Sequence, residues 1–267
     1  MMTISEGKDR ILELIKEKGL IWTISYVIKY TVKNKILDKS LSKKLEKGKE
    51  LVDLPSHSVA ANKQLWNEFY DWSEMGDEWT LGAEKYKGID PKKWKSDLVN
   101  NMLQKYIKKD SNVLEIGPGG GRWTELLQKI SKKLILVDIS PKCLDICKKR
   151  FLNSDNIEYN VIKKNLEFLD DSTVDYIWSY DVFVHINPST IKNYISDFKR
   201  ILKPNGIAII HHSGKYLDYT NPKEGWRSFF GKEEFEKLVT ENNLSIKEQN
   251  TELPHLPGDV ITVISKS

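Results

Sequence analysis

The stretch Val113-Leu-Glu-Ile-Gly-Pro-Gly-Gly-Gly-Arg-Trp123 runs from an apolar segment straight into a glycine-rich turn. The apolar residues predict a buried parallel strand, because both faces of such a strand are covered. Glycines permit a tight turn and let the backbone approach a ligand that any Cβ atom would block. Leu126 and Leu127 follow at helical spacing, so the turn leads into a helix. Strand, glycine loop and helix in this order are typical of the nucleotide-binding corner of an open α/β sheet.

Two details of this corner indicate the class of ligand. The glycines have the spacing Gly117-x-Gly119-x-Gly121, and Glu115 stands two residues ahead of the first. A carboxylate at this place suits an ammonium group and repels a pyrophosphate. The apolar stretch 134–138 ends in Asp138, 21 positions after Gly117, where an acid can accept hydrogen bonds from both ribose hydroxyls. The simpler alternative is a glycine loop that serves only as a turn, with Asp138 as a helix cap.

Strand and helix patterns alternate regularly from residue 91 onward. We expect helices at 91–107, 122–131, 141–152, 188–203 and 231–242, and strands near 112–116, 133–138, 157–162, 174–179, 206–212, 244–250 and 259–265. This alternation predicts an α/β fold of parallel β-α-β units with right-handed crossovers. Pro254 and Pro257-Gly258 leave no room for a helix between the last two strands, so we expect that pair to be antiparallel.

Composition divides the 267 residues into three segments. Residues 1–50 are predicted to form a basic, amphipathic helical extension, because residues 1–49 carry a net charge of +6 and the rest of the chain −2. Residues 51–90 form a cap segment rich in tryptophan and acids, and residues 91–267 form the α/β domain. The nearly neutral domain offers no basic surface for nucleic acid. No apolar run reaches the roughly 18–20 residues of a spanning helix and no signal peptide is visible, so we expect a cytoplasmic protein.

Several strings beyond the glycine loop occur together in one known group of proteins. They are Glu115-Ile-Gly-Pro-Gly-Gly-Gly-Arg-Trp-Thr124, Cys143-x3-Cys147-x2-Arg150-Phe151, Ser179-Tyr-Asp-Val-Phe-Val-His185, Leu202-Lys-Pro-Asn-Gly206, His211-His-Ser-Gly214 and Trp226-Arg227. Over residues 91–267 the chain resembles the class I S-adenosylmethionine-dependent methyltransferases. The strings are similar to those of methyltransferases found with cell-surface glycan and glycoside biosynthesis, which methylate sugar hydroxyls.

The resemblance implies a doubly wound, seven-stranded and mostly parallel sheet of strand order 3-2-1-4-5-7-6, with strand 7 antiparallel. It also implies S-adenosylmethionine as the cofactor. The residues expected to hold it are Glu115, Gly117, Gly119, Gly121, Arg122, Trp123, Asp138, Ile139, Asn165 and Ser179. The family commonly has an acid for the adenine amino group just after the third strand, whereas this chain reads Val161-Ile-Lys-Lys-Asn165. Adenine recognition therefore falls to Asn165 and backbone groups.

Methyl transfer to a hydroxyl group needs a base for the hydroxyl proton, and reacting groups in such sheets lie beyond the carboxyl ends of the strands. The candidates there are Asp181 and His185 after the fourth strand and His211 and His212 at the end of the fifth. His185 is the first choice as general base, because an unperturbed histidine has a pKa near 6.5. The alternative is a histidine packed on the core. His211 and His212 point in opposite directions along a strand, so at most one faces the site directly.

Metal ions are a rival use of these side chains. Some sugar methyltransferases use Mg²⁺, for which Asp181 could supply one oxygen ligand. No second acid stands close to Asp181 in the sequence, so we expect no metal site, and Mg²⁺ is the less favoured alternative.

Aromatic residues are the candidates for binding the acceptor. Trp226 and Arg227, in the loop of residues 214–230, suit stacking on a sugar ring and binding a carboxylate or phosphate, or else they anchor the loop. Trp79, with Trp72 and Trp94, either covers the acceptor site or forms the core of the N-terminal segment.

Three classes of function follow. The first is an O-methyltransferase of a sugar or glycan, the second a methyltransferase of another small molecule, lipid or protein, and the third a non-catalytic module that binds the cofactor. The bulky run from Leu20 to Tyr30, flanked by lysines, adds one expectation for residues 4–50. This segment either packs as a helical cap or attaches the protein peripherally to the inner face of the membrane, where lipid-linked glycans are assembled.

Overall fold

The structure, a computed structural model, describes residues 58–163, 165–214, 228 and 230–266. The helical extension predicted over residues 1–50 lies outside these residues. The helices are α4 (Val59–Gln64), the π-helix η1 (Leu65–Phe69), the 3₁₀ helix η2 (Asp77–Thr80), α5 (Leu81–Lys87), α6 (Pro91–Leu98), the π-helix η3 (Val99–Gln104), α7 (Thr124–Ile130), α8 (Pro141–Arg150), the 3₁₀ helix η4 (Phe183–His185), α9 (Pro188–Ile201) and α10 (Lys232–Glu241).

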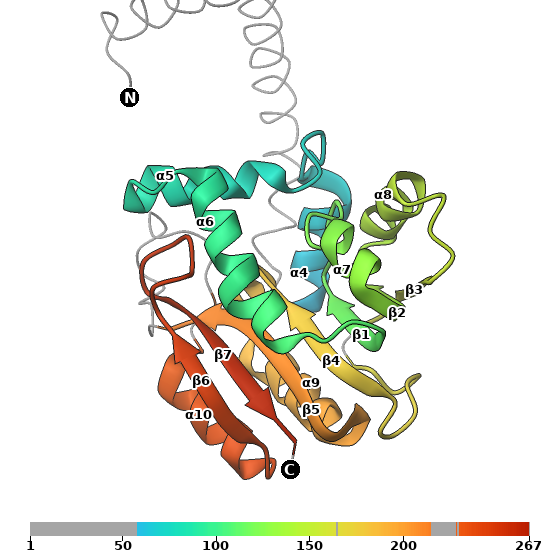
Figure 1. The fold of residues 1–267 in the computed structure, drawn as a ribbon, viewed down its shortest axis with the longest axis vertical. Helices are drawn as coiled ribbons and strands as arrows, with labels where there is room; N and C mark the ends of the chain where they lie inside the picture. The colour runs from blue at the N-terminus through green and yellow to red at the C-terminus, as the bar shows by residue number, and fades with distance from the viewer. Residues whose placement is uncertain (1–57, 164, 215–227, 229, 267) are drawn as a thin grey trace, which may run out of the picture. The chain divides into compact units, whose positions relative to one another are not determined.

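One seven-stranded sheet forms the centre of the fold (Figure 1). Its strands are β1 (Ser111–Ile116), β2 (Ser131–Asp138), β3 (Ile157–Val161), β4 (Val174–Ser179), β5 (Leu202–Ser213), β6 (Ser245–Asn250) and β7 (Asp259–Ser265). Their order is β3-β2-β1-β4-β5-β7-β6, and β7 runs antiparallel to both of its neighbours. The predicted strand order and the antiparallel final pair are confirmed.

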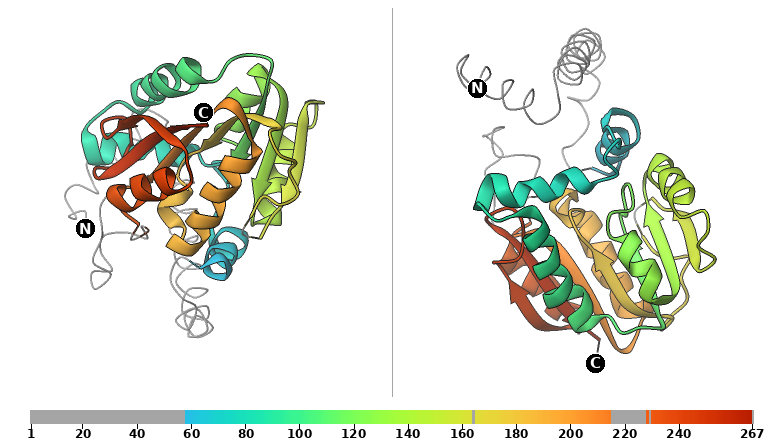
Figure 2. Two further views of the ribbon diagram at one scale, coloured as in Figure 1. Left: turned by 90° about the horizontal axis from the view of Figure 1, so that it is seen from below. Right: turned by 45° about the horizontal axis from the view of Figure 1, so that its top comes forward.

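Helices cover both faces of the sheet, as Figures 1 and 2 show. One face packs against α6, α7 and α8, whose buried side chains include Leu98, Leu127 and Leu144. The other face packs against α9 and α10, through side chains such as Phe198 and Phe235. Both faces of the central strands are therefore buried, which explains why these strands are apolar at nearly every position.

Three helices begin with the same local signal, a capping side chain followed by proline. Asp90, Ser140 and Asn187 each accept a hydrogen bond from a backbone N–H in the first turn of α6, α8 and α9, respectively. The next residue in each case is proline, which has no N–H to leave unsatisfied and has its φ already set for a helix. These signals fix where the helices begin and therefore where the loops between strands and helices lie.

The predicted helix over residues 91–107 is present, but not as one regular α-helix. After α6 the chain continues into the π-helix η3, in which the neighbouring residues Met102 and Leu103 are both buried. The short helices before α6 form a segment that lies over the edge of the sheet where the parallel strands end (Figure 1). From here on, the cap means residues 59–87, the helices of this segment.

In the described part of the chain, no helix combines the length and apolar character needed to cross a bilayer. The segment for which membrane attachment was considered, residues 4–50, lies outside that part.

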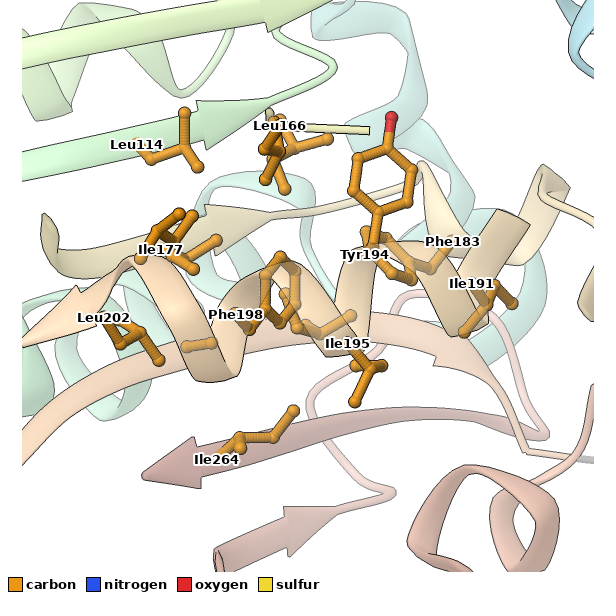
Figure 3. Close-up of a cluster of buried hydrophobic side chains, with 14 of the residues drawn as sticks. Leu114, Leu166, Ile177, Phe183, Ile191, Tyr194, Ile195, Phe198, Leu202 and Ile264 are labelled. Carbon is orange, nitrogen blue, oxygen red and sulfur yellow. The ribbon is translucent and has the colours of Figure 1, made fainter. Parts of the chain in front are cut away.

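Figure 3 shows the core between the sheet and α9. Phe198 is fully buried there and packs near Phe183 and Tyr194, with ring centroids 6.1 and 6.4 Å away.

Truncating Phe198 should leave a cavity that this core cannot close. We expect Phe198→Ala to lower the free energy of unfolding by about 3–5 kcal/mol, as measured by urea denaturation. Phe168→Ala is the matched control, because Phe168 is 46% exposed and its loss should cost less than about 1 kcal/mol. Equal losses for the two variants would contradict this description of the core.

Candidate active site

A cleft opens where the carboxyl ends of β1, β2 and β4 meet the cap. It encloses about 1020 Å³, part of it open to solvent. Nine of the residues predicted for the site line it: Trp79, Gly117, Gly119, Arg122, Trp123, Asp138, Ile139, Asp181 and His185. The structure therefore brings together residues that are spread over more than a hundred positions of the sequence.

The glycine loop forms the floor of this cleft. Gly117 and Gly119 adopt φ values of 68° and 56°, in the left-handed region that favours glycine. A Cβ atom on Gly117 would lie 2.4 Å from a methyl group of Val182, and one on Gly119 would lie 2.7 Å from the ring of Trp72. The backbone of the loop is thus exposed to the cleft at places where no other residue would fit.

Asp138 closes the cleft at the end of β2. Its carboxylate accepts a hydrogen bond of 2.8 Å from the backbone N–H of Ser140. Burial raises the pKa of Asp138 to about 6, although the N–H groups of Ser140, Gly119 and Ile139 favour the charged form. Near neutral pH this side chain is therefore a buried carboxylate at the cleft wall, able to accept hydrogen bonds from a polar ligand.

Glu115 does not line the cleft. Its carboxyl group lies beneath the loop, fully buried, and accepts a hydrogen bond of 2.6 Å from the hydroxyl of Thr124 in the first turn of α7. Burial raises the pKa of Glu115 to about 8. The expected direct contact with an ammonium group does not match this placement, because the side chain joins the loop to α7 from behind.

A buried ion pair joins the glycine loop to the end of β4. Arg122 Nη2 lies 2.7 Å from Asp181 Oδ2, and the guanidinium packs over the rings of Trp123 and Tyr180. The Arg122 side chain is 5% exposed, and its other terminal nitrogen, Nη1, is buried without a hydrogen-bond partner. A buried cationic donor at the wall of a cleft fits an anionic group of a ligand.

His185 lines the cleft from η4 and is held by the cap. Its backbone carbonyl accepts a hydrogen bond of 2.7 Å from Asn62, and its ring lies edge-to-face on Trp66 at 5.3 Å. The side chain is 9% exposed, so it can reach the cleft while its position is fixed.

His211 and His212 lie on opposite faces of β5, as the alternation of a strand requires, and neither lines the cleft. His211 lies behind Asp181, with Nδ1 3.2 Å from Asp181 Oδ1. The nitrogens of His212 lie 2.7 Å from the Ser213 carbonyl and 2.7 Å from the Thr262 hydroxyl. Burial lowers the pKa of His212 to about 3, so this histidine is a neutral part of the core.

Residues 113–206 match a methyltransferase domain family. Over this stretch, about a third of its length, the chain is similar to a methyltransferase domain. The match runs from within β1 to the first residues of β5 and therefore includes the glycine loop, Asp138, Asp181 and His185.

Two curated relatives share part of this domain. The chain is 33% identical over 98 residues to demethylmenaquinone methyltransferase of Tropheryma whipplei, which is 37% of this chain and 40% of that protein. It is 26% identical over 212 residues to ubiquinone biosynthesis O-methyltransferase of Pelagibacter ubique, covering 67% of this chain and 84% of that one.

Solved structures share the fold of the methyltransferase domain. N-methyltransferase NodS of Bradyrhizobium japonicum, in complex with S-adenosyl-L-homocysteine, superposes with a TM-score of 0.53 at 20% identity, over 72% of this chain and 92% of that one. A protein of Pyrococcus horikoshii superposes with a TM-score of 0.54 at 19% identity, over 72% and 99%.

Besides Glu115, three of the predicted cofactor residues do not line the cleft. Gly121 has a φ of 89° and packs on the ring of Phe151, and the hydroxyl of Ser179 donates to the carbonyl of Ile116. The Asn165 amide donates to the carboxylate of Glu167. Trp226 and Arg227, predicted to bind the acceptor, lie outside the described residues.

The cap supplies cleft residues that the sequence analysis missed. These are Asn62 and Trp66, which line the cleft. Of the three tryptophans considered for the acceptor site, Trp72 and Trp79 line the cleft, whereas Trp94 is buried in the core of the domain. The tryptophan-rich composition of the segment was the available signal, but nothing local in the sequence distinguished the tryptophans that line the cleft from the one in the core. Within the described ranges, no group of three or more His, Cys, Asp or Glu side chains could hold a metal ion.

Glu115 gives a testable dependence of stability on pH. Its pKa is about 8 in the folded state against 4.5 for the free side chain, so the folded state favours the protonated form. Its contribution to stability is complete below about pH 4.5 and is lost as the pH rises through about 8. Glu115→Gln cannot ionise, so its free energy of unfolding relative to the unmodified chain should increase between pH 5 and pH 9, by about 1.4 kcal/mol per unit of pKa shift.

Urea denaturation at pH 5, 7 and 9 measures this difference. Glu84→Gln, on the exposed side of α5, is the matched control and should follow the unmodified chain at all three values. If Glu115→Gln also follows the unmodified chain, the carboxyl group is not held in its neutral form.

Proposed function

We propose that this chain is an S-adenosylmethionine-dependent O-methyltransferase that acts on a hydroxyl group of a sugar or glycan. The observation that supports it most is the cleft, where a glycine loop, the carboxylate of Asp138 and the unpaired Nη1 of Arg122 converge within a methyltransferase domain.

The side chains of the cleft fit the parts of this cofactor. Arg122 would hold the carboxylate of the methionyl part, and Asp138 would accept from the ribose hydroxyls. The apolar side chains of Ile139, Cys143 and Ile162 line the same cleft and suit the adenine ring. The bound cofactor would supply a methyl group made electrophilic by a positively charged sulfur.

The acceptor hydroxyl must lose a proton as its oxygen forms the new bond. His185 is the proposed base, because it lines the cleft and a histidine can be neutral near pH 7. Asp181, on the same wall, would accept a hydrogen bond that orients the acceptor. Asp181 is negatively charged near neutral pH. Burial alone would raise the pKa of Asp181, but nearby histidines and Arg122 hold that pKa well below its usual range.

The remaining wall indicates the kind of acceptor. Trp66, Trp72 and Trp79 line the cleft together with the polar side chains of Asp181 and His185. A ring that carries hydroxyl groups on its edge and apolar C–H groups on its face complements such a wall. This supports a sugar as the acceptor, in line with the sequence resemblance.

A second candidate acceptor is the phenolic hydroxyl of a quinol. The same tryptophans would stack on an aromatic ring, and the relative from Pelagibacter ubique, which aligns over 84% of its length, is named for O-methylation in ubiquinone biosynthesis. Incubation with radiolabelled cofactor and a panel of sugars, lipid-linked glycans, catechols, lipids and peptides separates these candidates. Label on a catechol alone would favour the quinol, and tight cofactor binding without transfer to any of them would favour a non-catalytic module.

Cofactor binding through Asp138 can be measured by calorimetry. Removing the carboxylate leaves the ribose hydroxyls without their acceptor, at a cost of about 1–3 kcal/mol. We expect Asp138→Ala to bind S-adenosylmethionine roughly tenfold or more weakly. Asp145→Ala, on an exposed position of α8, is the matched control and should bind like the unmodified protein. An unchanged affinity of Asp138→Ala would refute this assignment.

The role of His185 can be separated from cofactor binding. Without the base, we expect His185→Ala to turn over ~10²-fold more slowly or worse, while the dissociation constant of the cofactor stays near that of the unmodified protein. Undiminished turnover of His185→Ala would mean that another group takes the proton.

A metal requirement can be tested separately. Activity of the unmodified protein should persist in excess EDTA, because the proposed chemistry uses no metal.

A further inference from the structure

A row of four side chains, all buried except the partly exposed Asp181, runs from β7 to the glycine loop. Asp259 Oδ2 lies 3.3 Å from His211 Nε2, and His211 Nδ1 lies 3.2 Å from Asp181 Oδ1. Asp181 Oδ2 in turn lies 2.7 Å from Arg122 Nη2. Only Asp181 and Arg122 line the cleft, so the other two members of the row can influence a ligand only through them.

The central member, His211, has a carboxylate at each ring nitrogen. Its ring is stacked on Tyr180, with centroids 4.2 Å apart and planes 18° from parallel, so its orientation is fixed. A neutral imidazole has one N–H group and can serve only one of the two carboxylates, whereas an imidazolium has one for each.

One contact favours the neutral ring. The backbone nitrogen of Asp181 lies 3.1 Å from His211 Nδ1, and it can donate only if Nδ1 carries no proton. The balance of charge favours the charged ring, and its effect is larger than that of this one contact. Asp181 and Asp259 carry two negative charges and Arg122 one positive charge. An imidazolium makes the buried row neutral, while a neutral ring leaves one buried carboxylate without a countercharge. The row is therefore most stable with His211 charged.

The charge of His211 depends on the groups around it. Burial alone would lower the pKa of His211, but Asp181 and Asp259 outweigh burial and raise it. His255, from the loop before β7, is a second imidazole near the row, with Nδ1 3.8 Å from Asp181 Oδ1 and 3.4 Å from the hydroxyl of Tyr180. His211 makes the shorter contacts and faces both carboxylates, so it is the imidazole that the row holds most closely.

The two carboxylates of the row differ in how firmly the backbone holds them. Asp181 has a φ of 62°, a left-handed conformation in which its position depends on the partners around it. Asp259 is fixed by the antiparallel pairing of β7 with β5, where it stands opposite Ser213. The row thus connects a rigid strand to a residue of the cleft wall in an unusual conformation.

We infer that Asp259, acting through a charged His211, is a positioning residue that holds the Asp181 carboxylate in place at the cleft wall. The inference rests on the proposed function, in which Asp181 orients the acceptor and His185 takes its proton. Activity should then need a neutral His185 and a charged His211. The pH profile should rise with the deprotonation of His185 and fall at higher pH with the deprotonation of His211.

Asp259→Asn tests this inference with two readouts. In the cofactor-free full chain labelled with ¹³C and ¹⁵N histidine, nuclear magnetic resonance measures the pKa of His211, assigned with His211→Gln. The variant should lower that pKa by roughly one to three units, because an opposite charge 3.3 Å from the ring has been removed. The high-pH limb of kcat/KM should move to lower pH by the same amount, and the low-pH limb should stay.

Asp175→Asn is the matched control. Asp175 accepts a hydrogen bond of 2.8 Å from the backbone of Asn112 and pairs with Lys203, so its loss disturbs the same sheet without touching the row. It should move neither limb of the profile. If Asp259→Asn does not fold, His211→Gln replaces it and should abolish the high-pH limb.

A His211 pKa that is unchanged in Asp259→Asn, or a loss of activity that is equal at all pH values, would overturn the inference. Failure of the proposed function gives a different result. If no acceptor is methylated, the resonance titration still shows whether Asp259 holds His211 in its charged form, and an unshifted pKa there overturns the inference by itself.

Discussion

The left-handed turn at the end of β1 is the constraint on which the site depends. Gly117, Gly119 and Gly121 all have positive φ values, and together they turn the chain from β1 into α7 within a few residues. The turn presents bare backbone to the cleft and leaves no room for side chains, since Val182 and the cap approach it closely. The buried hydrogen bond between Glu115 and α7 supports it from below, and Arg122 extends it to the end of β4.

The cap and the C-terminal hairpin contact the cleft from two sides. The cap contacts the cleft through its tryptophans and through Asn62, which binds the backbone of His185. The hairpin of β6 and β7 contributes Asp259, which reaches the cleft wall only through His211. Residues 113–206, the stretch that matches the domain family, thus supply the glycine loop, Asp138 and the end of β4 to the cleft. The cap lies outside that stretch and supplies Trp66, Trp72 and Trp79 to the cleft.

Local signals were sufficient to predict the helices and strands, whereas the strand order of the sheet followed from the resemblance to a known family. Periodicity located the strands and helices, capping residues followed by proline marked where helices begin, and the short prolyl connection before β7 predicted the antiparallel pair. Residues at or next to strand ends, such as Asp138 and Asp181, were the ones whose place in the cleft followed most directly from the expected fold. Contacts between distant segments, such as Asn62 with His185 or Asp259 with His211, depend on packing that no local pattern encodes. The direction of Glu115 was not predictable either, because in a strand buried on both faces its side chain has no solvent side.

The central claim is that the glycine loop, the end of β2 and the cap enclose one cofactor. Hydrogen–deuterium exchange of the full chain, with and without S-adenosylhomocysteine as the probe, tests it most directly. The account predicts slower exchange in residues 115–123, in residues 138–140 and in the cap, and unchanged exchange in β6 and β7. Exchange that stays the same in the glycine loop, or that slows there while the cap remains unaffected, would contradict it.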